Sequence, residues 1–265
     1  MNHLLRELAP FSEEVWGMLD DEARTRLTPK LGARRLVDFS GPMGWEFSAA
    51  TLGRVAMMDG PEAGVRARQR RVAPVVELRV EFSLEREELE SAQRGAVDAD
   101  FQPLDEAAGR IAAAENAAIL EGWTAAEFAG VVSASPYPAI ARGTDPADLP
   151  EKVAAAVEVL ANGGVGGPYA LAADPAVWVE VMGGTDSTGA RISRHVETVL
   201  GGPIVRVPGF SGAAVVSVRG GDYLFDVGQD LSLGYLEHDA RTVTLYLEES
   251  FAFRVATAEA AVAIR

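Results

Sequence analysis

Residues 75–84 alternate strictly between apolar and polar side chains. The apolar positions are Val76, Leu78, Val80, Phe82 and Leu84, and each is separated from the next by a charged or hydroxyl residue. This period of two predicts an antiparallel strand with one face on a core and the other in water. Its expected partner is segment 45–58, joined to it through the Asp59-Gly60-Pro61 turn and an arginine-rich loop. A lone ribbon of this length is marginally stable in water, so we expect support from another chain.

Two other segments have the periodicity of amphipathic helices. Ser12 can cap a helix that ends at Pro29, with apolar residues at every fourth position from Val15 to Leu27. A longer, alanine-rich helix is predicted from Pro103 to Gly122. The second half alternates shorter elements, with helices over 149–161, 176–182 and 192–200 and extended segments over 169–172 and 204–207. The pattern indicates an α+β protein with a protruding hairpin.

The charge of the chain limits its partners. Asp and Glu outnumber Lys and Arg by 39 to 24, a formal net charge of −15, whereas nonspecific nucleic-acid binding needs a basic surface. One basic cluster exists, with arginines at 66, 68, 70 and 71. It could contact an anion or RNA, but it lacks interleaved aromatic residues that stack on bases. A solvated loop, or a strip that meets an acidic neighbouring subunit, is the favoured interpretation, and no nucleic acid is expected.

The remaining composition favours a cytoplasmic protein. The chain has no cysteine, so neither disulfides nor thiolate chemistry is available. Charged residues begin at Arg6 and Glu7, which leaves no apolar region for a secretory signal. No run approaches the ~20 apolar residues of a membrane span. We therefore expect no membrane association.

No motif for catalysis or metal binding stands out. The three histidines, His3, His195 and His238, are far apart and lack the close companions of common metal sites. Segment 209–213 lacks the last glycine of a serine nucleophile elbow. The segment Asp186-Ser187-Thr188-Gly189 is similar to an aspartic-protease loop with one extra residue, but no second copy supplies the paired carboxylate. We expect a protein that is not an enzyme and holds no metal.

Several short sequence motifs occur in a fixed order along nearly the whole chain, and together they resemble a known family. They include Leu8-Ala9-Pro10, Gly41-Pro42-Met43-Gly44-Trp45-Glu46, Pro74-Val75-Val76-Glu77-Leu78-Arg79, Gly167-Pro168-Tyr169, Arg219-Gly220-Gly221-Asp222-Tyr223 and Gly228-Gln229-Asp230-Leu231-Ser232-Leu233-Gly234-Tyr235. Each motif alone is common in proteins, but the ordered series strongly resembles the encapsulins, also called the linocin M18 family. These are shell proteins of bacterial nanocompartments.

The resemblance implies the HK97-type capsid fold of tailed-phage heads. It assigns a peripheral domain with the N-terminal helix to 1–44, 84–135 and 223–265, an extended arm called the E-loop to 45–83, and an axial domain to 136–222. The implied function is self-assembly into an icosahedral hollow shell. A C-terminal targeting peptide would bring in the guest, a dye-decolorising peroxidase or a ferritin-like protein, for an oxidative-stress or iron-storage role. The alternatives are a phage major capsid protein and a protease or secreted antibacterial protein.

The resemblance also indicates site residues. It implies a groove for the targeting peptide, with apolar insertion and a few polar clamps, at Leu31, Arg34, Leu36, Asp38, Asp230, Leu231, Leu233 and Tyr235. It implies a five-fold pore loop at Gly183, Gly184, Thr185, Asp186, Ser187, Thr188 and Gly189, mildly acidic and flexible. Some encapsulins hold a flavin near a Trp after the E-loop. This chain has Arg86 at that position, so no flavin or other cofactor is expected.

Overall fold

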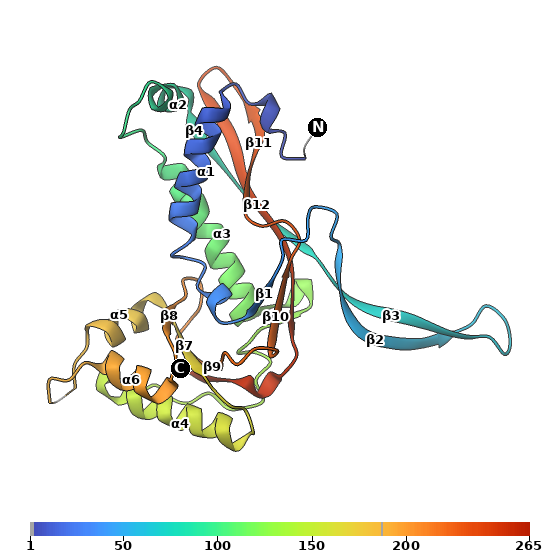
Figure 1. Ribbon diagram of the computed structural model, residues 1–265, viewed down its shortest axis with the longest axis vertical. Helices are drawn as coiled ribbons and strands as arrows, with labels where there is room; N and C mark the ends of the chain where they lie inside the picture. The colour runs from blue at the N-terminus through green and yellow to red at the C-terminus, as the bar shows by residue number, and fades with distance from the viewer. Residues whose placement is uncertain (1–2, 187) are drawn as a thin grey trace.

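The computed structural model describes residues 3–186 and 188–265. Its elongated body is built on a five-stranded sheet (Figure 1). The central strand pairs antiparallel with β10 and β11 along one edge and with β4 along the other, and β1 joins β10 in parallel. The strands are β1 (Asp38–Ser40), β4 (Val76–Glu85), β10 (Tyr223–Val227), β11 (Ser232–His238) and the central β12 (Thr242–Val255).

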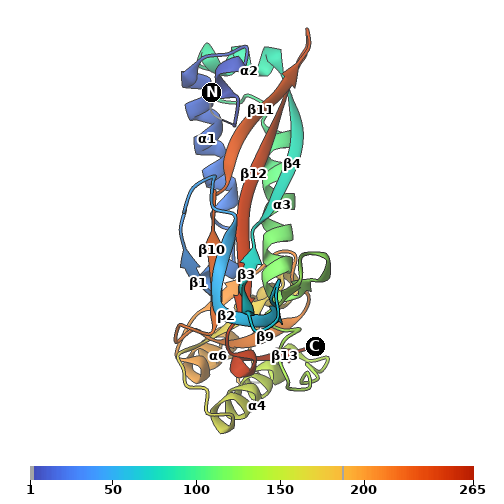
Figure 2. The same ribbon diagram turned by 90° about the vertical axis from the view of Figure 1, so that its right-hand side faces the viewer.

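Two helices cover one face of this sheet. α1 (Glu13–Leu27) and α3 (Gln102–Leu120) pack against each other and against the strands, whereas the short α2 (Arg86–Gln93) lies at one end of the body (Figures 1 and 2). Their apolar positions enter one core with the alternating face of β4. The two helices predicted over 12–29 and 103–122 are confirmed.

A second sheet forms the other end of the body. Its order is β13-β9-β7-β8, and every residue of β7, β9 and β13 is buried. Helices α4, α5 and α6 contact it. The strands are β7 (Tyr169–Ala173), β8 (Ile204–Arg206), β9 (Ala213–Ser217) and β13 (Ala261–Ile264), and the helices are α4 (Leu149–Asn162), α5 (Pro175–Gly183) and α6 (Ile192–Leu200). All five elements predicted over 149–207 are confirmed.

Short elements connect these layers. The strands β5 (Gly122–Trp123) and β6 (Phe128–Ala129) form a small hairpin after α3. Within the described ranges, the 3₁₀ turns are η1 (Arg6–Leu8), η2 (Ala33–Arg35), η3 (Thr124–Ala126), η4 (Pro146–Asp148) and η5 (Ala258–Ala260). Gly32 precedes η2, where a Cβ atom would collide with the carbonyl oxygen of Arg206. This close approach sets the path of the turn that carries Arg34.

The protruding ribbon differs from the prediction in its pairing. It consists of β2 (Ala49–Asp59) and β3 (Arg66–Pro74), and it projects away from the body (Figure 1). The predicted pairing of 75–84 with 45–58 is wrong, because β4 pairs with β12 over ten residues. The arginine-rich segment is likewise a strand and not a loop. Sequence alternation identifies a half-buried strand but carries no information about a partner far along the chain.

The domain boundaries remain a prediction, but two strands pair outside the segments that the resemblance assigns to them. β4 lies in the segment assigned to the arm and belongs to the central sheet, since its apolar face completes the core under α3. β13 lies in a segment assigned to the peripheral domain and pairs with β9 of the second sheet. The chain therefore returns to the second sheet at its end.

Candidate functional site

A groove of about 430 Å³ lies between α1, the N-terminal segment and the start of β11. Figure 2 shows α1 running beside β11 at this end of the body. The lining of the groove is rich in leucine, and charged side chains lie among the apolar ones. The lining residues are Leu4, Arg6, Asp20, Ala23, Arg24, Leu27, Thr28, Leu31, Arg34, Asp230, Leu231, Ser232, Leu233 and Leu247.

The apolar floor of the groove belongs to the core between α1 and the sheet. Leu27, Leu233 and Leu247 are buried, whereas Leu31 and Leu231 are partly buried and pack against the same core. Helical spacing places Ala23 and Leu27 on the sheet side of α1, and strand alternation places Leu233 and Leu247 opposite them. The partly exposed leucines are therefore the ones that remain accessible to a ligand.

Local contacts hold the N-terminal segment at the edge of the groove. The Leu4 carbonyl accepts the backbone N–H of Tyr235 at 2.9 Å. The Arg6 guanidinium forms an ion pair with Asp20 at 2.7 Å and lies 4.2 Å from the ring centroid of Trp16. These contacts tie both the first residues and α1 to β11, so one wall of the groove is built from residues that are far apart in sequence.

Arg34 connects the groove to buried acids of the core. Its guanidinium donates to both carboxylate oxygens of Glu115 at 2.6–3.0 Å, to Glu249 at 3.0 Å and to Asp230 at 2.7 Å. Glu115 and Glu249 are fully buried, whereas the Asp230 side chain is 42% exposed at the groove. Burial opposes the charged form of Arg34, but hydrogen bonding to Glu115 and the charges of the three acids outweigh it and raise its pKa. Arg34 therefore stays charged and fixes Asp230 at the groove wall.

Within this network, Glu249 has a raised pKa. Burial raises the pKa of Glu249 well above its ordinary value, and the charge of Glu115 raises it further, against the attraction of Arg34. One guanidinium cannot neutralise three carboxylates. A proton on Glu249 reduces the uncompensated charge in the core.

The raised pKa of Glu249 predicts that Glu249→Gln weakens the pH dependence of stability. The folded wild-type protein holds the Glu249 proton more tightly than the unfolded chain does. Protonated Glu249 therefore stabilises the folded state fully below the unfolded pKa of ~4.3. This stabilisation is lost as the pH rises toward the folded pKa, and the total loss is ~1.4 kcal/mol for each pH unit between the two pKa values. A glutamine amide can donate to Glu115 and accept from Arg34 at any pH. We expect the variant to melt at a higher temperature than wild type at pH 9 and at a similar one near pH 4.5, and equal melting at pH 9 would contradict the assignment.

Five of the eight predicted groove residues line this groove. They are Leu31, Arg34, Asp230, Leu231 and Leu233. Leu36 instead turns inward after η2 and is buried in the core of the second sheet. Asp38 accepts the backbone N–H of Gly221 at 2.7 Å, and Tyr235 is buried with its hydroxyl 2.6 Å from Nδ1 of His238. These three lie outside the groove because β1, η2 and the upper part of β11 lead the chain away from it.

Sequence reasoning missed the remaining lining residues. Ala23 and Leu27 belong to the apolar stripe of α1, and that stripe is the signal that could have found them. Leu4, Arg6 and Leu247 have no such signal, because their place depends on the backbone hydrogen bond between Leu4 and Tyr235 and on the pairing of β11 with β12. Neither contact follows from spacing in the sequence.

The predicted pore loop connects α5 to α6, and its Ser187 lies outside the described residues. Asp186 Oδ1 accepts the Thr188 hydroxyl at 2.7 Å and the backbone N–H groups of Thr188 and Ala190 at 2.8 and 3.0 Å. The hydrogen bond from the Thr188 hydroxyl, together with these N–H groups, lowers the pKa of Asp186. Oδ2 lies 3.7 Å from Nδ1 of His195. Asp186 thus ties the loop together as a fixed negative charge, and its place at a pore remains a prediction.

The described ranges contain no sign of metal binding or of a membrane span. Within them no cluster of three or more His, Cys, Asp or Glu side chains could hold a metal ion, and no helix has the length and apolar character needed to cross a bilayer. Arg86, which occupies the position considered for a flavin-stacking aromatic residue, is the first residue of α2 and donates to the Asp239 carbonyl at 3.2 Å. The expectation that no cofactor is held stays a prediction.

Solved structures share the architecture of this chain. A virus-like particle from Pyrococcus furiosus aligns with a TM-score of 0.66 at 16% identity and covers 97% of this chain and 100% of that chain. The capsid of an empty GTA particle aligns with a TM-score of 0.53 at 15% identity, covering 88% and 89%. The fold is therefore that of the HK97-type capsid proteins.

Sequence comparisons then narrow the class to a family. The Linocin_M18 model, described as encapsulating protein for peroxidase, matches residues 1–252. Type 1 encapsulin shell proteins of Rhodospirillum rubrum and Brevibacterium linens are 44% and 41% identical, covering 100% and 99% of this chain and 97% and 98% of those proteins. The protein of Mycobacterium tuberculosis is 38% identical over 100% and 99%. This chain belongs to the family of type 1 encapsulin shell proteins, which are structural proteins and not enzymes.

Proposed function

We propose that copies of this chain assemble into a closed icosahedral shell that encloses a guest protein. The ribbon of β2 and β3 projects away from its own body along most of its length (Figure 1), which suits an arm that packs on another copy. The named activity of the matching family model, encapsulation of a peroxidase, supports the same role. A ferritin-like guest rests on the family resemblance alone.

The groove is the proposed seat of the guest's C-terminal targeting peptide. The partly exposed Leu31 and Leu231 offer apolar contacts to a peptide. Two ion pairs, Arg34–Asp230 and Arg6–Asp20, line the walls of the groove as polar groups. An extended peptide with apolar side chains at alternate positions matches this lining. Because a shell carries many grooves, an oligomeric guest can engage several at once and needs little affinity at each.

The single observation that carries this proposal is the leucine-lined groove on a capsid-like fold. It is tested by electron microscopy of particles purified from the native cells, with mass spectrometry of the proteins that co-purify. Uniform hollow shells that contain one peroxidase or ferritin-like protein are expected. Unassembled subunits, or particles filled with DNA, would instead refute the compartment role.

A further inference from the structure

A cavity of about 530 Å³ lies where the ribbon of β2 and β3 joins the body. Its walls come from the base of the ribbon, the hairpin of β5 and β6, the start of β10 and the end of β12 (Figure 1). The volume is within the range of ~300–1,000 Å³ that is typical of small-molecule sites. Pro74 of the lining precedes β4, whereas Arg86, the position considered for a flavin-stacking residue, follows that strand. The cavity is therefore separate from that position and from the groove.

Three arginines line this cavity in a chain that is strongly acidic. Arg54 and Arg71 belong to the ribbon and Arg254 belongs to β12, whereas Glu127 is the one acid among the lining residues that the structure describes. The whole chain has a formal net charge of −15. Three guanidinium groups beside one carboxylate make the cavity locally positive, so it attracts anions that the rest of the chain repels.

A β-bulge brings the two ribbon arginines to the cavity. The register of β2 with β3 shifts between Thr51 and Val55, and Gly53 within this shift has a φ of +64°. Bulges redirect side chains and are common beside binding sites. Arg54 and Arg71 lie on the two strands at the shift, and both line the cavity. Like charges on neighbouring strands are destabilising, and an anion between them would remove this repulsion.

The guanidinium groups differ in how they are held. Within residues 3–186 and 188–265, those of Arg54 and Arg71 form no hydrogen bond or ion pair. The Nη1 group of Arg254 donates to the Thr51 carbonyl at 2.8 Å, and its Nε lies 3.9 Å from Oδ2 of Asp226. Arg254 therefore supplies a fixed positive charge, while Arg54 and Arg71 supply the donors that a ligand can use.

Apolar side chains form much of the remaining lining. Leu52, Leu224 and Val255 are partly buried, and Phe128 and Phe253 are buried. Sites for organic ligands combine such apolar walls with a few well-placed polar groups. The lining thus suits a molecule that has an apolar body and an anionic end.

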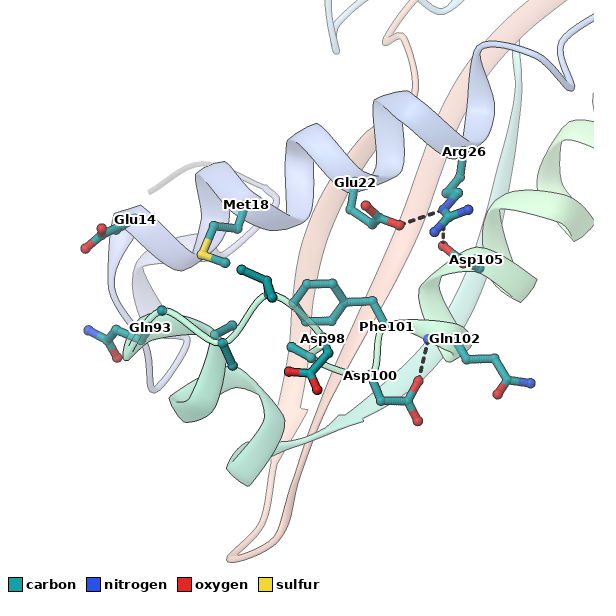
Figure 3. A pocket seen from close by; sticks show the side chains of 15 residues that line it. Glu14, Met18, Glu22, Arg26, Gln93, Asp98, Asp100, Phe101, Gln102 and Asp105 are labelled. Atoms are coloured by element: carbon teal, nitrogen blue, oxygen red, sulfur yellow. Dashed lines mark hydrogen bonds and ion pairs between the residues drawn. The ribbon is translucent and has the colours of Figure 1, made fainter.

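The larger cleft between α1 and the loop that joins α2 to α3 has the opposite charge. Its volume is about 900 Å³, and five acids and one arginine line it. Figure 3 shows that Glu22 and Asp105 both bind this arginine, Arg26, at the side of the cleft. That cleft therefore disfavours anions, and charge distinguishes the two cavities.

We propose that the cavity at the base of the ribbon binds a small organic phosphate. The phosphate lies between Arg54 and Arg71, and the apolar body of the ligand lies against Leu52 and Leu224. A phosphate monoester carries about −1.5 to −2 charges at pH 7 and has three strong acceptor oxygens. It therefore matches the excess of guanidinium groups better than a single carboxylate does, and guanidinium groups bind phosphate oxygens in a bidentate manner.

Isothermal titration calorimetry tests this site on the full-length protein, in the assembly state in which it is isolated. The probe is 1-naphthyl phosphate, and inorganic phosphate and 1-naphthol represent its anionic and apolar halves. We expect the ester to bind at least about tenfold more tightly than either half, because only the ester uses both the guanidinium groups and the apolar wall.

A double substitution then tests the two free guanidinium groups. Arg54→Gln with Arg71→Gln is expected to weaken binding of the ester at least about tenfold, because the charged donors are lost. Arg66→Gln with Arg68→Gln is the matched control, since it removes the same charge from the same ribbon outside the cavity lining. All four arginines are exposed, so we expect both variants to fold, and circular dichroism checks this.

Three outcomes would overturn the proposal. They are equal affinity for the ester and one of its halves, unchanged binding by the Arg54 and Arg71 variant, and an equal loss in the control. The site does not depend on the proposed shell. A protein that assembles but does not bind the ester would refute only the site, whereas one that binds the ester without forming shells would refute only the proposed function.

Discussion

Replacement of Arg34 by methionine is expected to lower the free energy of unfolding by about 3–5 kcal/mol. Arg34 is the guanidinium that hydrogen-bonds the buried Glu115 and Glu249, and its side chain is only 15% exposed. Methionine fills similar space but leaves Glu115 buried without its bidentate partner. The cost comes from the unpaired buried charge and exceeds the net value of the ion pair itself.

Denaturant unfolding of unassembled subunits measures this loss. Arg24→Met is the matched control, since Arg24 lines the same groove but pairs with Asp21 in the solvent, where the side chains are 71% and 77% exposed. We expect this control to stay within about 0.5 kcal/mol of wild type. An equal effect of the two substitutions would show that the Arg34 network does not stabilise the core.

The combined substitution of Leu31→Asp and Leu231→Asp is expected to weaken guest binding by about two orders of magnitude while shells still form. Each leucine side chain buried on binding contributes ~1.5–3 kcal/mol, and two of them account for a change of this size. Both residues are partly exposed at the groove. A charge at either position leaves the apolar groove unsuited to a leucine-rich peptide.

Leu236→Asp is the control for this experiment, because Leu236 is exposed on β11 and lies outside the groove. Shells of each variant are purified from cells that also express the guest, and the guest is quantified per shell subunit. Full loading of the Leu31 and Leu231 variant would exclude the groove as the peptide site. Leu233 is less suitable for this test, since it is 1% exposed in the core and an aspartate there would disturb folding as well.

The stability network and the groove share Arg34 and Asp230, which explains why the site cannot be changed freely. Arg34 holds Asp230 on the groove wall and Glu115 and Glu249 in the core. A substitution that alters the polar wall at Arg34 also exposes the core to an unpaired charge. Changes at Leu31 or Leu231 affect the groove without this penalty, so they separate binding from folding.

Local patterns in the sequence predicted several helices and strands correctly, but they did not predict how the strands pair. The four-residue apolar spacing of α1 and the alternation of β4 depend on neighbours along the chain, and both elements form as expected. The partner of β4 is β12, near the end of the chain, and no turn joins the two strands directly. Segment 45–58 was the expected partner because it is close in the sequence. β4 pairs with β12 instead, because this pairing completes the core beneath α3.

By itself, the sequence determined the α+β class, the helices α1, α3, α4, α5 and α6, the strands β4, β7 and β8, the acidic charge and, through ordered motifs, the family. The tertiary structure alone decided that β2 and β3 form the ribbon, that Leu4, Leu31 and Leu231 share one groove, and that Leu36 does not. Secondary structure follows from periodicity over a few residues. Grooves and charge networks follow from the packing of elements that are far apart in the chain, and that packing is set by which combination buries the most apolar surface.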